Sequence, residues 1–325
     1  MTEQKAPLIS VLITSYNHER FTLTAINAIF AQRGRFEIEI IFCDDASTDN
    51  TPAIVREIAS RDARLKPILR QENIGLVCNF VDGLRRCRGD YIAYCDGDDF
   101  WVDDKKLDRQ IDALSRNVNC SFSFHDVIIS DSTGNLSSNW SVGRKNQHWL
   151  EGIKSPEDFL KSKLICFHAT SVLFRRESID YRFLNKIGSN IKGLDFGIAA
   201  MLAGNGSGYY FTEAMASYRK HNTSISAQRY SPNGIKFALE EVAQLEGVIN
   251  EHYNGIFSEF VAENRWGHIV NALYGLAGLA KASKSIKIFS QFVLVGIENV
   301  VMRRISFRDL FYIIRAEFFL FRRRD

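Results

Sequence analysis

Short apolar runs alternate with amphipathic stretches through the first third of the chain. The runs are typical of strands buried on both faces, and the stretches between them carry apolar residues at helical spacing. The expected strands are 8–14, 38–43, 65–69 and 91–95, and the expected helices are 20–32, 51–60, 77–87 and 105–116. Strands that alternate with helices over such short distances predict an α/β fold, with a mostly parallel sheet flanked by helices.

The pattern changes twice further along the chain. Between residues 120 and 231 we expect strands at 121–129 and 170–174, helices at 155–163 and 194–203, and a glycine-rich turn at 204–208. From residue 235 onward every stretch has helical spacing. The chain is therefore divided into a region 1–230 that contains the sheet and a helical C-terminal region 231–325.

The composition excludes several classes of protein. Apolar residues make up 46% and charged residues 24%, as in globular proteins, and the net charge of +3 is too small to predict nucleic-acid binding. The six cysteines form no CxxC pair, and Cys43 and Cys95 lie inside apolar runs, where a thiol acts as a small buried side chain. No secretory signal or run of about 18 apolar residues is visible. A cytoplasmic protein, soluble or peripheral to a membrane, is expected.

Two aspartate clusters follow expected strands. Asp44 and Asp45 come after the second strand, and Asp96, Asp98 and Asp99 come after the fourth. In open α/β sheets, ligands bind outside the carboxyl ends of the strands, where both clusters fall. Massed carboxylates repel one another, and a divalent cation with a polyphosphate removes that repulsion. The clusters predict a metal-assisted enzyme that acts on a nucleotide diphosphate compound. The alternatives are a helix-capping loop for the first cluster and a solvated turn for the second.

Four segments carry a family resemblance when they are taken in order. They are SVLITSYN (10–17), DDASTD (44–49), NIG (73–75) and GDYIAYCDGDDFW (89–101). Their order and spacing resemble family 2 glycosyltransferases, which are inverting enzymes with the GT-A fold that use nucleotide-activated sugars. The match is close over residues 8–110 and looser to about residue 226. The resemblance implies that region 1–230 is a GT-A catalytic domain that binds a nucleotide sugar.

The resemblance assigns roles to residues in the first 100 positions. It places Thr14, Tyr16, Asp45 and Asn73 around the nucleoside, where Tyr16 would stack on a base and Asp45 would accept a hydrogen bond from an imide N–H. Asp96 would lie near the ribose or the metal. Asp98 would bind the metal, Mn²⁺ or Mg²⁺, directly.

Two later segments carry the remaining roles. Asp195 in GLDF (193–196) matches the position of the family's catalytic base, although Leu194 stands where relatives often have a second acidic residue. Its alternative role is the N-cap of the 194–203 helix. In YRKHNTSIS (218–226), the resemblance makes His221 a metal or phosphate ligand. Arg219 and Lys220 would neutralise phosphate, or this segment is a basic surface loop.

His125 and His168 are interpreted as structural, because they sit in or beside expected strands with no identifiable partner.

The implied reaction is a single displacement at the anomeric carbon of a UDP- or dTDP-sugar. Asp195 would take the proton from the acceptor hydroxyl, and the configuration would invert. The acceptor class is a glycan or a lipid-linked oligosaccharide, as in assembly of bacterial surface polysaccharide. Two rivals are a nucleotide-sugar pyrophosphorylase and an inactive sugar-nucleotide-binding module. The glycine-free loop SYNHER (15–20) argues against the first, and the full set of carboxylates argues against the second.

The end of the chain predicts an amphipathic helix. Six apolar residues fall on one helical arc between positions 307 and 321, and arginines lie along its margin and at its end. Such a helix suits an anionic inner membrane surface at its cytoplasmic face. The alternative is a packing helix, which includes a homodimer contact.

Overall fold

The computed structural model describes residues 5–140, 150–161, 167–187, 194–224, 244, 247–249 and 251–255. Its centre is one sheet with strand order β3-β2-β1-β4-β9-β6-β10-β5, to which β7 adds beside β6 and β8 beside β10. The strands are β1 (Leu8–Ser15), β2 (Glu37–Asp44), β3 (Leu65–Leu69), β4 (Tyr91–Asp96), β5 (Phe100–Trp101), β6 (Cys120–Ser130), β7 (Leu136–Trp140), β8 (Gly152–Lys154), β9 (Leu173–Arg175) and β10 (Ser207–Arg219). The helices are α1 (Thr22–Phe30), α2 (Thr51–Arg61), α3 (Leu76–Arg86), α4 (Lys106–Arg116), α6 (Pro156–Lys161), α7 (Tyr181–Ile187) and α8 (Leu194–Gly204). Two short 3₁₀ turns are η1 (Ala169–Ser171) and η2 (Arg176–Ser178).

The first half of the sheet is wholly parallel. β3, β2, β1 and β4 pair in parallel, as the alternation of strands and helices predicted. The second half is mixed, because β9 runs antiparallel to both β4 and β6, while β10 runs parallel to β6. The predicted α/β architecture is thus confirmed, with a sheet that is mixed beyond β4.

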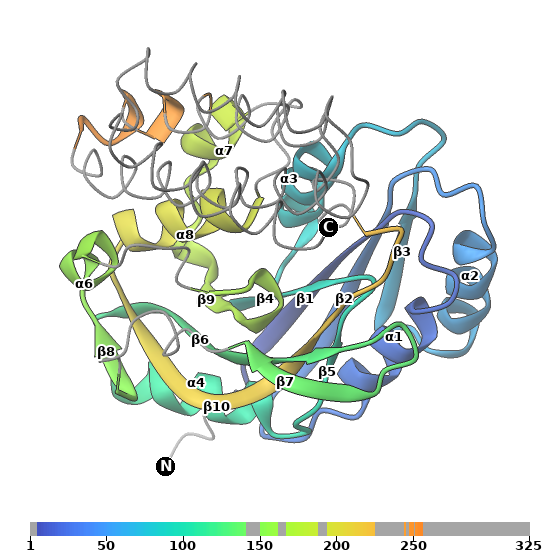
Figure 1. The fold of residues 1–325 in the computed structure, drawn as a ribbon, viewed down its shortest axis with the longest axis horizontal. Helices are drawn as coiled ribbons and strands as arrows, with labels where there is room; N and C mark the ends of the chain where they lie inside the picture. Colours follow the sequence, from blue (N-terminus) through green and yellow to red (C-terminus); the bar gives the residue numbers. More distant parts are fainter. Residues whose placement is uncertain are drawn as a thin grey trace, which may run out of the picture.

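Both faces of the sheet are covered by helices (Figure 1). Leu12 of β1 belongs to the core on the side of α3, α7 and α8. Its neighbours Val11 and Ile13 point the other way, into the core formed with α1, α2 and α4. Successive residues of a strand face opposite sides, so a strand buried on both faces is apolar throughout. Cys43 and Cys95 are free, fully buried thiols in these cores, as predicted.

Two elements of the second half differ from expectation. The expected strand at 170–174 begins only at Leu173, because η1 precedes it and is capped by the side chain of His168. The expected turn at 204–208 ends early, because Ser207 begins β10, a strand of 13 residues that the sequence analysis missed.

Two predictions concern the C-terminal part of the chain, most of which lies outside the described residues. The helical region from residue 231 lies outside the described residues apart from the short pieces between 244 and 255, and the amphipathic helix near the C-terminus lies wholly outside them. Within the described part of the chain, no helix is long and apolar enough to span a membrane.

Candidate active site

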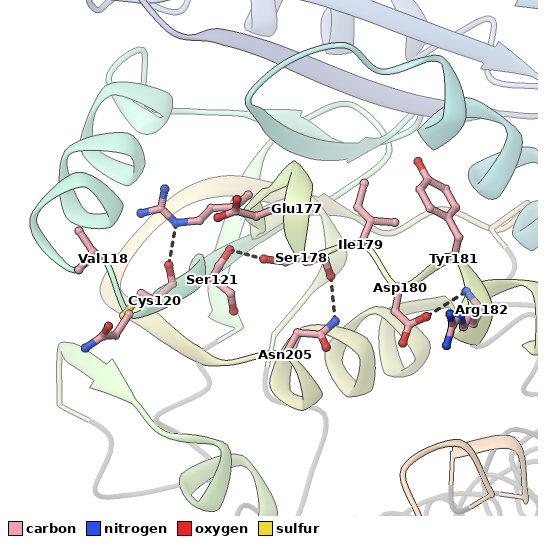
Figure 2. A pocket seen from close by; sticks show the side chains of 12 residues that line it. Val118, Cys120, Ser121, Glu177, Ser178, Ile179, Asp180, Tyr181, Arg182 and Asn205 are labelled. Carbon is pink, nitrogen blue, oxygen red and sulfur yellow. Dashed lines mark hydrogen bonds between the residues drawn. The ribbon is translucent and has the colours of Figure 1, made fainter.

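The amino-terminal edge of the sheet holds a cavity of about 690 Å³ at the start of β6 (Figure 2). It contains none of the predicted site residues. The Arg175 guanidinium donates to two backbone oxygens there, Cys120 O at 3.0 Å and Leu114 O at 2.7 Å. This guanidinium is thus paired within the protein, and the predicted site residues lie at the opposite edge of the sheet.

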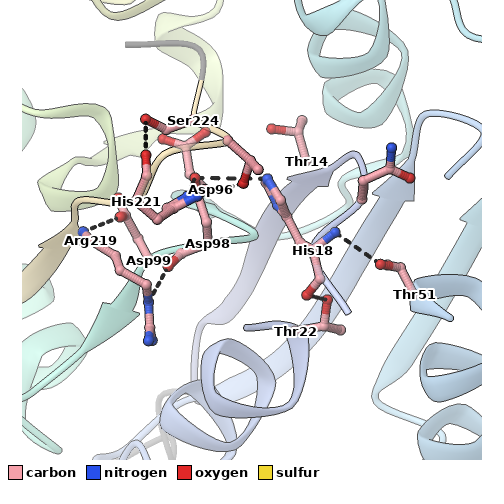
Figure 3. A network of polar contacts seen from close by, with 12 residues as sticks. Thr14, His18, Thr22, Thr51, Asp96, Asp98, Asp99, Arg219, His221 and Ser224 are labelled. Atoms are coloured by element: carbon pink, nitrogen blue, oxygen red, sulfur yellow. Dashed lines mark hydrogen bonds and ion pairs between the residues drawn. The ribbon is translucent and has the colours of Figure 1, made fainter. Parts of the chain in front are cut away.

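At the carboxyl-terminal edge, β1, β2 and β4 end together, which places their aspartate loops side by side. The loop after β4 turns tightly against β1, where Gly97 N donates to Thr14 O at 2.9 Å. A Cβ atom on Gly97 would lie 2.9 Å from His18 Nδ1 and from Thr14 O. Only glycine permits this approach without a shift of the backbone. The turn directs Asp96, Asp98 and Asp99 into one small region (Figure 3).

Asp98 lies between two histidines. His221 Nε2 is 2.9 Å from Asp98 Oδ2, and His18 Nε2 is 3.7 Å from the same oxygen. Burial acts to raise the pKa of Asp98, but the charges of His18 and His221 and the hydrogen bond from His221 together hold it below its usual value. Asp98 is therefore a carboxylate, as a metal ligand must be.

The pair Asp98 and His221 fits a divalent cation. Neighbouring ligands of an octahedral ion with bonds of about 2.1 Å lie about 3 Å apart. The distance of 2.9 Å between Asp98 Oδ2 and His221 Nε2 meets this requirement without movement. A carboxylate with an imidazole suits Mn²⁺ better than Mg²⁺, which prefers oxygen ligands.

Asp96 is held by a chain of hydroxyl groups. Tyr94 Oη donates to Asp96 Oδ1 at 2.5 Å, and Thr14 Oγ1 lies 2.6 Å from Tyr94 Oη. Burial raises the pKa of Asp96 well above its usual value, and the charges of Asp98 and Asp195 add to this effect. Thr14 is buried with its hydroxyl turned to Tyr94, so its predicted contact with a nucleoside stays a prediction.

Arg219 ties the end of β10 to the aspartate loop. Its backbone N–H donates to Asp99 Oδ1 at 2.9 Å, and its Nε donates to Asp98 O at 2.8 Å. The guanidinium lies 4.8 Å from the ring centres of both Phe21 and Phe100. Its Nη2 is buried and finds no hydrogen-bond partner among the described residues, which leaves one donor for the predicted phosphate. Lys220 is exposed, and its backbone N–H donates to Ser130 O.

The predicted nucleoside residues gather beside the loop after β2. Asp45 is buried and accepts hydrogen bonds from Ile74 N and Gly75 N, each at 2.9 Å, while Asn73 Nδ2 donates to Asp45 O at 3.0 Å. Asp45 and the segment that begins at Asn73 are thus joined by hydrogen bonds, and their contacts with a base stay a prediction. Tyr16 is 46% exposed, as a platform for a ligand requires.

Asp195 lies in the first turn of α8. The alternative role as N-cap is wrong, because Asp195 is inside the helix rather than before it. The charge of Asp195 reaches the aspartate loop. The pKa of Asp96 is raised by burial, by Asp98 and by Asp195. The pKa of Asp99 is raised by burial, by Asp98 and Asp96, and to a smaller extent by Asp195. The structure therefore brings Asp195 to the same region as Asp96 and Asp98, although its role as base stays a prediction.

Sequence reasoning missed three residues of this region. Tyr94 holds Asp96, His18 faces Asp98, and His168 lies 3.7 Å from Asp99 Oδ2. A signal was available for Tyr94 alone, because a tyrosine in the middle of a buried strand needs a partner for its hydroxyl. His168 had been assigned a structural role, and its cap on η1 agrees with that, but it also faces the aspartates.

Comparison with known proteins identifies the family. The model of the family described as Glycosyl transferase family 2 matches residues 10–183, which is more than half of the chain. The chain belongs to this family.

Among curated relatives, the uncharacterized protein Rv1520 of Mycobacterium tuberculosis is 35% identical over 224 residues, covering 69% of this chain and 62% of that protein. This chain thus matches less than two thirds of that relative's length. TuaG of Bacillus subtilis, named as a putative teichuronic acid biosynthesis glycosyltransferase, is 28% identical over 230 residues, covering 71% of this chain and 85% of that protein.

Solved structures of similar fold agree with the GT-A architecture. S. aureus TarS 1-349 in complex with UDP-GlcNAc has a TM-score of 0.56 at 14% identity and covers 91% of each chain. The mannosyltransferase PcManGT from Pyrobaculum calidifontis, in complex with GDP-Man and Mn²⁺, has a TM-score of 0.52 at 16% identity and covers 96% of this chain and 86% of that one. At these identities the likeness shows the fold alone.

Proposed function

We propose that this family 2 member is a metal-dependent inverting glycosyltransferase that moves a sugar from a nucleotide diphosphate donor to an acceptor hydroxyl. The observation that carries the proposal is the convergence of Asp96, Asp98, Asp195 and His221 at the carboxyl edge of the sheet, with Asp98 and His221 spaced as two ligands of one cation. Burial and the neighbouring carboxylates raise the pKa of Asp96 well above its usual value, and buried groups with such shifted pKa values are common at functional sites.

The donor would lie across the ends of β1, β2 and β4. Tyr16 would stack on the base, and Asp45 would accept its imide N–H through lone pairs not used by Ile74 and Gly75. Asp98 and His221 would hold the diphosphate through a divalent cation, which supplies the charge that stabilises the leaving group. Arg219 Nη2 would donate to a phosphate oxygen from its place between two aromatic rings.

Asp195 would act on the acceptor. From the side opposite the diphosphate it would take the proton of the attacking hydroxyl. A single displacement inverts the anomeric carbon, so an α-linked donor gives a β-linked product.

The relatives suggest the substrate class. TuaG is named for teichuronic acid biosynthesis, and TarS was solved with UDP-GlcNAc. A UDP-sugar donor and a glycan or lipid-linked acceptor in surface polysaccharide assembly follow by analogy.

A donor screen tests the reaction. The full chain is incubated with UDP- and dTDP-sugars and Mn²⁺ or Mg²⁺, and release of nucleoside diphosphate is measured. We expect release that depends on the cation. Formation of a sugar nucleotide from a nucleoside triphosphate would instead identify a pyrophosphorylase, and donor binding without turnover would identify a binding module.

The base is tested by Asp195→Asn. Turnover should fall by two or more orders of magnitude, in the range typical of general-base loss, while donor affinity survives. Asp108→Asn is the matched control, because Asp108 also lies in the first turn of a helix, α4, beside Gly34. An Asp195→Asn variant as fast as the parent, or a product with retained configuration, would overturn the mechanism.

A further inference from the structure

Beside the pair Asp98 and His221 lies a second group of potential ligands. One oxygen each of Asp96 and Asp99 and one ring nitrogen of His168 lie within 4.8 Å of one another. They come from two segments, the end of β4 with the loop that follows it, and the residue that caps η1. Asp98 is not a member of this group, because its Oδ2 faces His221 and His18 instead.

An unpaired buried oxygen points into this group. Asp99 is 1% exposed, and Arg219 N occupies its Oδ1. Its Oδ2 is buried, finds no hydrogen-bond partner among the described residues, and lies 3.7 Å from His168 Nδ1. An unpaired buried carboxylate oxygen costs free energy, and a cation bound there would offset that cost.

We propose that Asp96, Asp99 and His168 form a second divalent-cation site, distinct from the Asp98 and His221 pair and independent of bound nucleotide. Of three ligands around one octahedral ion with bonds of about 2.1 Å, at most one pair lies opposite, about 4.2 Å apart, and the other pairs lie about 3 Å apart. The three atoms lie within 4.8 Å of one another, so ion binding needs them to approach by up to about 1.8 Å. Two carboxylates and an imidazole select Mn²⁺, Co²⁺ or Zn²⁺ over Mg²⁺, because imidazole is a poor ligand for Mg²⁺.

The site has a structural consequence. The cation would join η1 to the aspartate loop and, through Asp99 and Arg219, to the end of β10. It would also offset the negative charge of the aspartates that surround Asp195. The proposal concerns cation binding and stands apart from the transfer reaction.

The test measures binding without a sugar nucleotide. The full chain, stripped with EDTA, is dialysed against Mn²⁺, and bound Mn²⁺ is counted by electron paramagnetic resonance. We expect Mn²⁺ binding that persists in Asp98→Asn and falls at least tenfold in affinity when Asp99→Asn or His168→Phe is added to Asp98→Asn, which removes the other cation site. A tenfold excess of Mg²⁺ should not displace this ion.

Asp99→Asn is chosen to keep the fold, and His168→Phe keeps the ring while it removes the hydrogen bond that caps η1. The amide oxygen introduced by Asp99→Asn can still accept the Arg219 N–H, and a phenyl ring at position 168 keeps the contact with Tyr218, whose ring centre lies 4.5 Å from that of His168. If one variant fails to fold, the other decides. The proposal is overturned if the stripped protein binds no Mn²⁺, if Asp98→Asn abolishes all binding, if the two variants bind as the parent does, or if Mg²⁺ displaces the ion readily.

Discussion

Glu39, near the amino-terminal edge of the sheet, and Asp99, at the carboxyl-terminal edge, are both almost fully buried, at 3% and 1% exposure. Glu39 is surrounded by donors: Lys66 Nζ and Ser10 Oγ lie 2.5 Å from its carboxylate, and Arg88 N lies 2.7 Å away. Asp99 has one backbone donor on one oxygen and other carboxylates around it. The same kind of group is thus buried in two different ways.

The pKa values record this difference. Burial acts to raise the pKa of Glu39, but Lys66, Ser10 and Arg88 N outweigh it and hold the value below normal. Burial also acts on Asp99, where the charges of Asp98 and Asp96 add to it, and its pKa rises well above normal. A carboxylate with protein partners stabilises the fold, whereas one without them costs stability unless a ligand supplies the positive charge. The buried carboxylate near the amino edge is thus fully supported by donors, and the one at the carboxyl edge is not.

The largest expected effect is at the carboxyl edge. Asp98→Asn should lower nucleoside diphosphate release by about a thousandfold, or about 4 kcal/mol, because the leaving group loses its cation. The fold should persist, since the amide can still accept from His221. Release and cation-dependent donor binding are measured beside a melting curve. Near-normal turnover would show that Asp98 does not hold the cation.

The two edges should respond to the same chemical change with opposite signs. Glu39→Gln removes a buried charge from three donors and should lower the free energy of unfolding by about 1–3 kcal/mol. Asp99→Asn relieves repulsion and should raise it by a similar amount in EDTA. Urea unfolding of both variants measures the difference. Equal losses of unfolding free energy in the two variants would show that Glu39 and Asp99 are supported by the protein in the same way.

The contribution of Glu39 to the free energy of unfolding should also depend on pH. Its folded pKa is lowered below the normal value of 4.5, so its contribution to stability is present above about pH 4.5 and is lost as the pH falls through the folded pKa. The gap between the parent and Glu39→Gln should therefore close in acid. A gap that stays constant down to about pH 3 would mean that the charge of Glu39 is not the cause.

The sequence was most informative where contacts are local. The parallel half of the sheet and its helices were predicted within about two residues, because each element carries its own periodicity. The strand β10 was missed because Thr212 and Glu213 interrupt its apolar alternation, at a bulge where its register against β6 shifts. A strand of this length with an irregular register does not show the simple alternation by which strands are predicted from sequence.

The candidate site was predicted in part for a similar reason. The aspartates stand out because they follow strands, and strands in parallel end at one edge. His168 faces an aspartate far earlier in the chain, Asp99, across a contact that depends on the placement of η1. No spacing in the sequence reports such a contact, so His168 was interpreted as structural.

A smaller effect is expected at Tyr16, where substitution should change ligand binding and leave the stability of the fold unchanged. Tyr16 is 46% exposed, so Tyr16→Ala should leave the melting temperature unchanged and weaken binding of a free nucleoside diphosphate by about 1–3 kcal/mol, the range for an aromatic stacking on a base. Tyr16→Phe is the matched control, because it keeps the ring and should bind normally. Calorimetry measures both. A drop in stability with unchanged affinity would move Tyr16 to the supporting part of the fold.

The smallest expected effect concerns backbone strain at the carboxyl edge. Ala46, directly after Asp45, has φ of 61°, a left-handed conformation that costs a residue with a Cβ atom about 1 kcal/mol or more. Ala46→Gly removes this cost but adds freedom to the unfolded chain, so the net change in stability should lie between zero and a gain of about 1 kcal/mol. Ala53→Gly is the matched control, because Ala53 is exposed in α2 and the same substitution there should cost about 1 kcal/mol. Urea unfolding compares the two variants. Equal losses would show that the loop after β2 stores no strain, and the carboxyl edge would then differ from the amino edge in its charges alone.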